Sequence, residues 1–335
     1  MKCLCCGKEI PETASEYVKE AQWHSACVRK FFGTKDLPEL DISEDTLTRI
    51  AEESTNRGFT VPGVQKKMSL HLTTDGGKPR LTLVNYPTGY ILKPQTEQYE
   101  SLPEAEYLVM QMAEKTGIDT VPYAMVRMSG CTSSTAYITK RIDRILPTKK
   151  DPVLKLLAME DFCQLEQRLT ENKYQGSYER CAKVISRYSV RSGLDLSELF
   201  LRVVFSFVVG NSDMHLKNFS LIETSSGSQE YVLSGAYDML PVNVVLPEDR
   251  DELALTVNGK KHNIRRNDFL KFAEVSGISR EVAAKMIEKV LSMKENYLLL
   301  CDRSYLPDHM KERFHMLIEE RTRALEPVNL HVAID

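Results

Sequence analysis

The feature that most constrains the fold is an almost uninterrupted apolar segment at residues 199–209, which reads LFLRVVFSFVV. A helix that is apolar around most of its circumference has to be surrounded by a protein core. The chain then becomes polar at once, because residues 210–222 read GNSDMHLKNFSLI. Polar groups beside a core are costly unless they have hydrogen-bond partners or a function. The segment therefore predicts a buried helix that delivers a polar functional loop.

The amino-acid composition of the chain is that of an ordinary globular protein. The 335 residues are 42% hydrophobic and 27% charged with a net charge of −3, which argues against disorder and allows two or three packed units. No run of about 20 apolar residues predicts a membrane span, and the first residues are too polar for a signal peptide. We therefore expect a cytoplasmic protein with no membrane partner. Charges of both signs are interspersed, so we expect no direct nucleic-acid binding by the chain alone.

Four of the eight cysteines crowd the first 27 residues, where they suggest a metal site. The pairs Cys3/Cys6 and His24/Cys27 have the same spacing of two intervening residues. Two such pairs give the tetrahedral geometry of a structural zinc site, which has no open position for catalysis. Cys5 could replace Cys3 or Cys6. The alternative is a cluster of reduced thiols in a frayed terminus, but the spacing favours a zinc ribbon.

A strand-rich stretch follows the cysteine cluster. Short runs bounded by turn residues predict antiparallel strands at KMSLHL, RLTLVNY, GYILKP, YAMVRMS and TAYITKRI. One helix interrupts them between Ser101 and Gly117, because five apolar residues recur there at helical spacing. Another helix is expected at SEDTLTRIAEES, with Ser43 as its N-cap.

The character changes to helical after about residue 150, up to an amphipathic helix marked by Met310, Phe314, Leu317 and Ile318. We therefore predict an α+β chain with three parts. These are a zinc ribbon at 1–35, a sheet-rich lobe at 36–150 and a helical lobe at 151–335.

The polar loop carries the residues that indicate chemistry. Asp213 and Asn218 are separated by four residues, and two short apolar strands then precede Asp238. This order of an Asp, an Asn, a hairpin and a second Asp is the one that kinase-type phosphoryl-transfer enzymes use. One carboxylate accepts the proton of the attacking hydroxyl, and the other two groups offer hard oxygen ligands to Mg²⁺. Taken singly, these residues could be caps or turn residues.

The sheet-rich lobe adds a candidate pair for the nucleotide. Lys93 ends a predicted strand, and Glu106 lies on the helix that follows. A lysine on phosphates that is braced by a helical glutamate is again the kinase arrangement, and a surface ion pair is the alternative. Residues 60–67 read TVPGVQKK and contain one glycine, so they match neither common phosphate-loop pattern.

At this point the sequence resembles the HipA-like serine/threonine kinases of bacterial toxin–antitoxin loci. The resemblance covers about residues 55–270. It rests on GVQKKMSLHL, YILKP, LPEAEYLVMQMAEKTGI, AYITKRIDR, MEDFCQL, KYQGSY, GNSDMHLKNFSLI, AYDM and ELALTVNGKK, which stand in family order. The chain lacks the extra N-terminal subdomain of long HipA proteins, so it is similar to the short HipT type, whose missing piece is the separate HipS. An N-terminal zinc ribbon also occurs in short members.

The resemblance implies a two-lobed kinase-like fold and a role for each site residue. Asp213 is implied as the catalytic base, and Asn218 and Asp238 as Mg²⁺ ligands. The implied ATP-binding residues are Gly63, Val64, Gln65, Lys67, Lys93, Lys140, Arg141, Ile142, His215, Lys217 and Tyr237, with Glu106 as a supporting ion-pair partner. The implied cofactors are ATP, Mg²⁺ and structural Zn²⁺.

One position departs from the family pattern. Family members carry serines just before the loop glycine and phosphorylate one of them to inactivate the kinase. Here Thr60 and Pro62 occupy those positions, and proline cannot accept phosphate. Autoinhibition by this route would rest on Thr60 alone.

These observations predict an ATP- and Mg²⁺-dependent protein serine/threonine kinase, and the resemblance implies that it acts as the toxin of a toxin–antitoxin system. By resemblance its target is an aminoacyl-tRNA synthetase, and its partner is an antitoxin of the HipB or HipS type. Two alternatives stay open. One is a small-molecule phosphotransferase, and the other is a weakly active kinase fold that serves as a regulatory scaffold.

Overall fold

The computed structural model describes residues 1–40, 67–74, 77–83, 87–128, 135–148 and 150–327. The chain divides into two compact units, one made of Met1–Tyr107 with Val121–Leu156 and the other of Leu108–Thr120 with Leu157–Asp335. The helix predicted at SEDTLTRIAEES lies outside the described residues, as do Thr60, Gly63, Val64 and Gln65. No helix in the described ranges is both long and apolar enough to cross a membrane.

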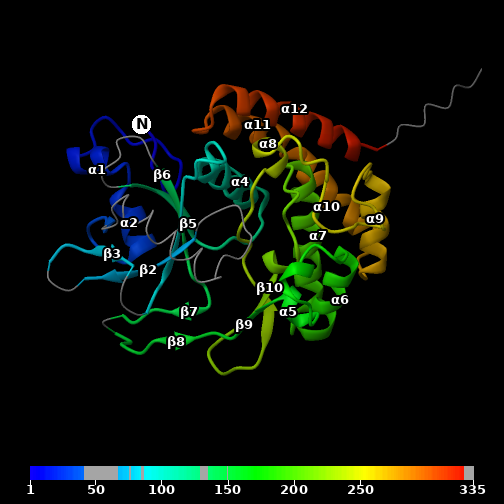
Figure 1. Cartoon of the computed structure of the whole chain (residues 1–335), viewed down its shortest axis with the longest axis horizontal. Helices are drawn as coiled ribbons and strands as arrows, with labels where there is room; N and C mark the ends of the chain where they lie inside the picture. Colours follow the sequence, from blue (N-terminus) through cyan, green and yellow to red (C-terminus); the bar gives the residue numbers. More distant parts are fainter. Residues whose placement is uncertain (41–66, 75–76, 84–86, 129–134, 149, 328–335) are drawn as a thin grey trace, which may run out of the picture. The chain divides into compact units, whose positions relative to one another are not determined.

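The first unit is built on a six-stranded sheet with the order β1-β3-β2-β4-β6-β5. Figure 1 labels β2, β3, β5 and β6 among these strands. The strands are β1 (Glu39–Leu40), β2 (Met68–Thr73), β3 (Arg80–Thr82), β4 (Tyr90–Pro94), β5 (Tyr123–Arg127) and β6 (Thr135–Lys140). All neighbours are antiparallel except β1 and β3. The five strands predicted from short apolar runs are therefore confirmed as β2 to β6. A separate antiparallel pair, β7 (Arg144–Ile145) and β8 (Lys155–Leu156), completes this unit.

The N-terminal segment contains two short helices and packs on this sheet through α2 and the residues beside it. Ser15 caps α1 (Glu16–Ala21), and α2 (Ser25–Phe32) ends at Gly33 in the left-handed conformation. Trp23 is buried against Phe31 and Phe32, and both phenylalanine rings lie within 6.0 Å of the Tyr90 ring on β4. The backbone also joins the segment to the sheet, because Met125 N on β5 donates to the carbonyl of Leu4 at 2.9 Å.

The predicted helix between Ser101 and Gly117 is confirmed as α4 (Leu102–Thr116). The five apolar residues whose helical spacing predicted this helix are each at most 1% exposed: Ala105, Leu108, Val109, Met112 and Ala113. Gly117 ends it with a φ of 86°, a conformation that favours glycine. The division between the two units falls within this helix.

The second unit is mainly helical and holds a three-stranded antiparallel sheet in the order β11-β10-β9. Its strands are β9 (Met159–Asp161), β10 (Ser220–Glu223) and β11 (Tyr231–Leu233). Its helices are α5 (Phe162–Leu165), α6 (Tyr178–Tyr188), α7 (Ser192–Val208), α8 (Val242–Val245), α9 (Arg266–Val275), α10 (Arg280–Ser292), α11 (Lys294–Asp302) and α12 (Asp308–Leu325). It also has two short 3₁₀ helices: η1 (Thr170–Asn172) precedes α6, and η2 (Leu216–Asn218) lies within the functional loop.

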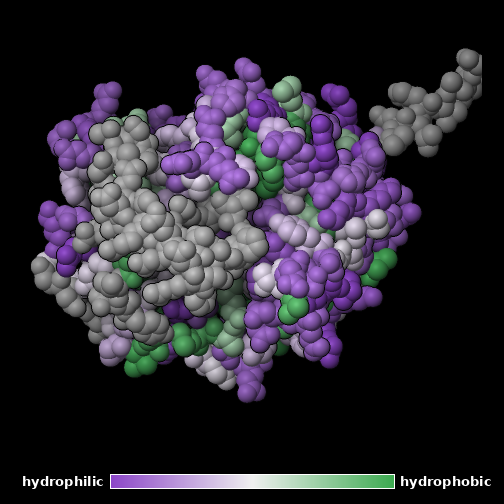
Figure 2. Space-filling view, in the orientation of Figure 1, coloured by the Kyte–Doolittle hydropathy of each residue, from purple (hydrophilic) through white to green (hydrophobic). Residues whose placement is uncertain are grey.

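Residues 199–208 of the apolar segment form the second half of α7. Every residue from 199 to 208 is buried, including Arg202, whose Nε donates to Glu198 at 2.8 Å. The prediction of a helix surrounded by core is therefore confirmed. The coloured atoms in Figure 2 are largely hydrophilic, with hydrophobic side chains in small separate patches, which agrees with an apolar interior. The fold class is α+β, as predicted.

Candidate functional site

A sharp turn at the end of α7 starts the functional loop. Gly210 has a φ of 68°, and a Cβ atom there would come within 2.4 Å of the Leu317 side chain. Only glycine combines this backbone conformation with this close packing. The next two side chains are buried and tied down. Asn211 Oδ1 accepts from the backbone N of Asp213 at 3.3 Å, and the Ser212 hydroxyl donates to Asp249 at 2.6 Å.

Asp213 and Asn218 are brought together by the loop. The Asn218 amide nitrogen donates to the backbone carbonyl of Asp213 at 2.8 Å, and Asn218 is only 6% exposed. This bond leaves the amide oxygen as the Asn218 atom that could bind a cation. The Asp213 side chain is 44% exposed, so its carboxylate can be reached by a substrate.

Asp238 follows the predicted hairpin, which the structure confirms as the β10–β11 pair. It has a φ of 54°, in the left-handed region that few residues other than glycine adopt, although aspartate is among the more frequent exceptions. Such conformations cluster at functional sites. The neighbouring Tyr237 hydroxyl holds this segment against the loop, through hydrogen bonds of 2.5 Å with the Ser220 hydroxyl and 3.2 Å with the Lys217 carbonyl. Asp238 and Asn218 supply the hard oxygen donors that Mg²⁺ prefers.

His215 is buried close to Asp213 and Asp238, and its imidazole is neutral. It is 5% exposed, and its Nε2 is 3.8 Å from Asp213 Oδ1. Burial lowers the pKa of His215 to about 4, although the charges of Asp213 and Asp238 act in the opposite direction. At neutral pH the ring therefore carries no positive charge.

The lowered pKa of His215 predicts a loss of stability in mild acid. An unfolded histidine with a pKa of 6.5 binds a proton below that pH, whereas the folded one does so only near pH 4. The unfolded state thus binds more protons in this window, and stability falls as pH falls. We expect wild type to lose about 2 kcal/mol more than His215→Gln between pH 7 and pH 5 in urea unfolding. His309→Gln is the control, and equal losses in all three proteins would refute the neutral buried ring.

Lys217 is paired with a residue that the sequence did not single out. Its ammonium lies 2.7 Å from Asp161, the N-cap of α5. Tyr174, whose hydroxyl donates to Asp213 at 2.5 Å, was likewise not predicted as a site residue. The motif KYQGSY contains this tyrosine, but nothing in its spacing reveals a partner 39 residues away.

The candidate lysine of the first unit forms a buried ion pair. Lys93 Nζ lies 2.5 Å from Glu106 Oε1, and the two side chains are 3% and 2% exposed. The alternative of a surface pair is therefore excluded. Lys93 also lies 5.2 Å from the centre of the Tyr137 ring, its neighbour on β6.

Breaking this pair should be costly, because it removes the negative charge that lies 2.5 Å from a buried ammonium. We expect Glu106→Gln to lower the free energy of unfolding by about 3–5 kcal/mol. The matched control is Glu16→Gln, which breaks the exposed pair with Lys19 and should cost less than about 1 kcal/mol. Urea unfolding of both variants provides the comparison. Similar small losses in the two would contradict a buried charged pair.

The predicted hinge residues lie at the end of β6. Lys140 places its ammonium 5.6 Å from the centre of the Phe31 ring, and burial lowers its pKa. Arg141 N donates to the Gly89 carbonyl at 2.9 Å, while its guanidinium pairs with Asp143 at 2.8 Å. Ile142 is partly buried, and Lys67 is exposed just before β2.

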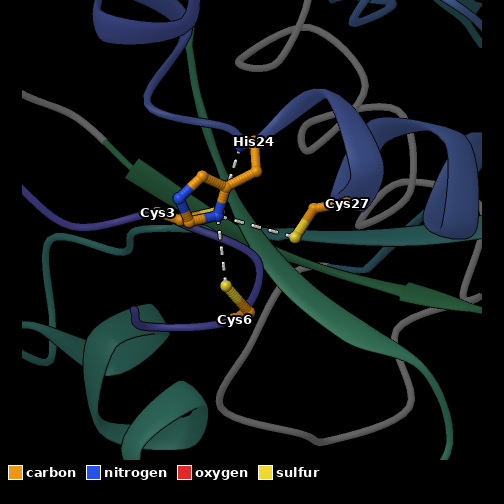
Figure 3. A group of neighbouring side chains, drawn as sticks. All are labelled: Cys3, Cys6, His24 and Cys27. Atoms are coloured by element: carbon orange, nitrogen blue, oxygen red, sulfur yellow. Dashed lines mark hydrogen bonds between the residues drawn. The ribbon is translucent and has the colours of Figure 1, made fainter. Parts of the chain in front are cut away.

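Four side chains of the N-terminal segment converge as a candidate metal centre (Figure 3). One donor atom each from Cys3, Cys6, His24 and Cys27 lies within 4.8 Å of all the others. His24 Nδ1 lies 3.5 Å from Cys6 Sγ and 3.9 Å from Cys27 Sγ.

The chemistry of this group fits a structural metal ion. His24 Nε2 is 3.2 Å from the carbonyl of Glu9, an arrangement that leaves Nδ1 as the ligating nitrogen. Burial raises the pKa of the Cys27 thiol, because it disfavours the charged thiolate. The charge of Cys3 raises this pKa further, because two thiolates so close together repel each other. A divalent cation removes this repulsion, and Cys₃His is a common zinc ligand set. Cys5 is not a member of the group, so the geometry favours Cys3 and Cys6.

Comparison with known protein families identifies the family of this chain. The family described as HipA-like C-terminal domain matches residues 59–297, more than half of the chain. The chain belongs to this family. A Haemophilus influenzae protein named "Putative kinase" is 25% identical over 81% of this chain and 82% of its own length. Two Sinorhizobium fredii proteins, "Putative kinase Y4mE" and "Putative kinase Y4dM", are 27% and 32% identical over 70% and 61% of the chain. The matches span 54% and 49% of those two relatives, about half of each.

Solved structures share the fold of this HipA-like chain at low sequence identity. HipA of Shewanella oneidensis, solved with HipB and its operator DNA, matches with a TM-score of 0.66 and 16% identity, over 82% of this chain and 70% of its own. The Helicobacter pylori proinflammatory kinase CtkA matches with a TM-score of 0.50 and 15% identity, over 73% and 87% of the two chains. The predicted resemblance to HipA-like proteins is therefore confirmed, and the fold is kinase-like.

Proposed function

We propose that this HipA-like chain is an ATP- and Mg²⁺-dependent protein serine/threonine kinase. The observation that carries the proposal is the loop in which Asn218 is hydrogen-bonded to Asp213, followed beyond the hairpin by Asp238. A reachable carboxylate and two fixed oxygen donors are the groups that phosphoryl transfer requires. The kinase names of the relatives support the same reading.

Each residue has a definite task in this proposal. Asp213 accepts the proton of the attacking serine or threonine hydroxyl. Asn218 and Asp238 would hold Mg²⁺, which supplies positive charge between the nucleotide phosphates. In the first unit, Lys93 is the residue proposed to contact ATP, and Glu106 fixes its ammonium. His215, buried 3.8 Å from Asp213, is neutral and therefore leaves the negative charge of that carboxylate in place.

The cellular role that we propose is that of a toxin neutralised by an antitoxin of the HipB or HipS type. HipA of Shewanella oneidensis was solved with HipB, which supports such a partner. The proposed target is an aminoacyl-tRNA synthetase. One phosphate adds up to two negative charges, which would repel ATP from a nucleotide-binding loop of the target. Few phosphorylation events would then stall translation.

Phosphoproteomics after brief expression tests the target class. Wild type is compared with Asp213→Asn, so that only sites made by this kinase are counted. We expect wild-type-specific phosphoserine or phosphothreonine in a synthetase, together with growth arrest. Growth arrest without any modified synthetase would overturn the target, and phosphate found only on small molecules would favour a small-molecule phosphotransferase.

A further inference from the structure

The hydroxyl of Tyr174 is hydrogen-bonded to the carboxylate of Asp213, the candidate catalytic base. Tyr174 donates to Asp213 Oδ1 at 2.5 Å, and none of the roles proposed above uses this contact. The tyrosine is 42% exposed, so its side chain has room to leave the carboxylate without disturbing the core.

The segment that carries Tyr174 is fixed to the functional loop at several points. It follows η1, and the Lys173 carbonyl accepts from the backbone N of Leu216 at 3.2 Å. The Tyr174 ring packs edge-on against His215 with ring centres 5.0 Å apart. Further along, the Tyr178 hydroxyl donates to the Met214 carbonyl at 3.0 Å. The position of the Tyr174 hydroxyl is therefore built into the fold of this unit.

The chemistry of the contact matches that of an acceptor. In phosphoryl transfer the base receives a hydrogen bond from the attacking hydroxyl. Tyr174 offers the same kind of donor to the same carboxylate. Burial and the nearby Asp213 charge raise the pKa of the phenol, so the hydroxyl keeps its proton at neutral pH. A substrate hydroxyl and the phenol compete for Asp213.

We propose that Tyr174 is an internal competitor that holds the acceptor position on Asp213 until a protein substrate displaces it. The inference rests on the proposed function, because it assigns Asp213 as the base. The hydrogen bond of Tyr174 would suppress ATP hydrolysis, because it keeps water from the Asp213 carboxylate while no protein substrate is bound. Tyr174 is thus a positioning residue that acts through Asp213.

Hydrolysis of Mg-ATP by the full chain, with water as the acceptor and no protein added, tests this role. We expect Tyr174→Phe to raise the hydrolysis rate about tenfold, the factor that one lost hydrogen bond to a charged acceptor allows. Tyr188→Phe removes a comparably exposed hydroxyl from α6 and should leave the rate unchanged. In the double variant Tyr174→Phe/Asp213→Asn the increase should vanish. An unchanged or lower rate in Tyr174→Phe, with Mg-ATP still bound, would overturn the proposal.

A spectroscopic readout separates this inference from the proposed function. In protein labelled with ¹³Cζ-tyrosine, the Tyr174 signal is identified by its loss in Tyr174→Phe. We expect Asp213→Asn to shift this signal, because the hydrogen bond to a charged acceptor is lost, and no shift would refute the contact. If the signal shifts but none of the proteins releases γ-phosphate from ATP, the kinase proposal is refuted. Tyr174 would then be hydrogen-bonded to Asp213 but would not compete with any substrate hydroxyl.

Discussion

Asp213→Asn is expected to reduce phosphoryl transfer by about 10²–10⁴-fold, the range that loss of a general base produces. Mg-ATP should still bind with nearly wild-type affinity, because the oxygen donors of Asn218 and Asp238 are unchanged. The substitution keeps the size of a side chain that is 44% exposed, so little stability should be lost.

Phosphate incorporation into protein and calorimetric titration with Mg-ATP measure the two effects separately. Asp151→Asn, which changes an exposed aspartate paired with Lys155, is the control and should behave as wild type. Near-normal transfer by Asp213→Asn would show that another group is the base. Loss of both transfer and binding would instead assign Asp213 to the metal.

Removal of the metal expected at the candidate centre should unfold the N-terminal segment that carries Cys3, Cys6, His24 and Cys27. Binding of structural zinc contributes on the order of 10 kcal/mol to the folding of such small segments. Trp23 is the single tryptophan of the chain and is 1% exposed between Phe31 and Phe32. A chelator, or the variant Cys27→Ser, should therefore shift the tryptophan emission to longer wavelength as this ring meets water.

Cys5→Ser provides the matched control, because Cys5 lies in the same segment but outside the convergent group. We expect about one zinc per chain in wild type and in Cys5→Ser by elemental analysis, and almost none in Cys27→Ser. Zinc loss in Cys5→Ser but not in Cys3→Ser would show that the ligand set is wrong. Metal-free wild type with a buried Trp23 would contradict a structural metal altogether.

Sequence periodicity was sufficient to predict the elements with strong patterns. The helix α4 followed from apolar residues at helical spacing, and α7 followed from a run too apolar for any exposed position. The hairpin before Asp238 was predicted from two short apolar strands, and both strands formed. By contrast, β9 contains only Met159, Glu160 and Asp161, and it is a strand because β10 offers it hydrogen-bond partners.

The candidate site was predictable where chemistry depends on residue order along one loop. Asp213, Asn218 and Asp238 could be proposed from their spacing, and the buried Lys93–Glu106 pair from a strand and a helix in sequence. Contacts between segments that are far apart in the sequence could not be predicted from residue order or spacing. Tyr174 meets Asp213 through the packing of two loops, and spacing alone could not decide between Cys5 and its neighbours.

The measurement that tests the central claim most directly is transfer of labelled γ-phosphate from ATP to protein. The purified wild-type chain, free of antitoxin, is incubated with Mg-ATP and a bacterial protein extract, and the labelled amino acids are identified by mass spectrometry. We predict label on serine or threonine of an extract protein that depends on Mg²⁺ and is absent with Asp213→Asn. Tight binding of Mg-ATP without any label on protein hydroxyls would contradict the assignment of this HipA-like chain as a protein kinase.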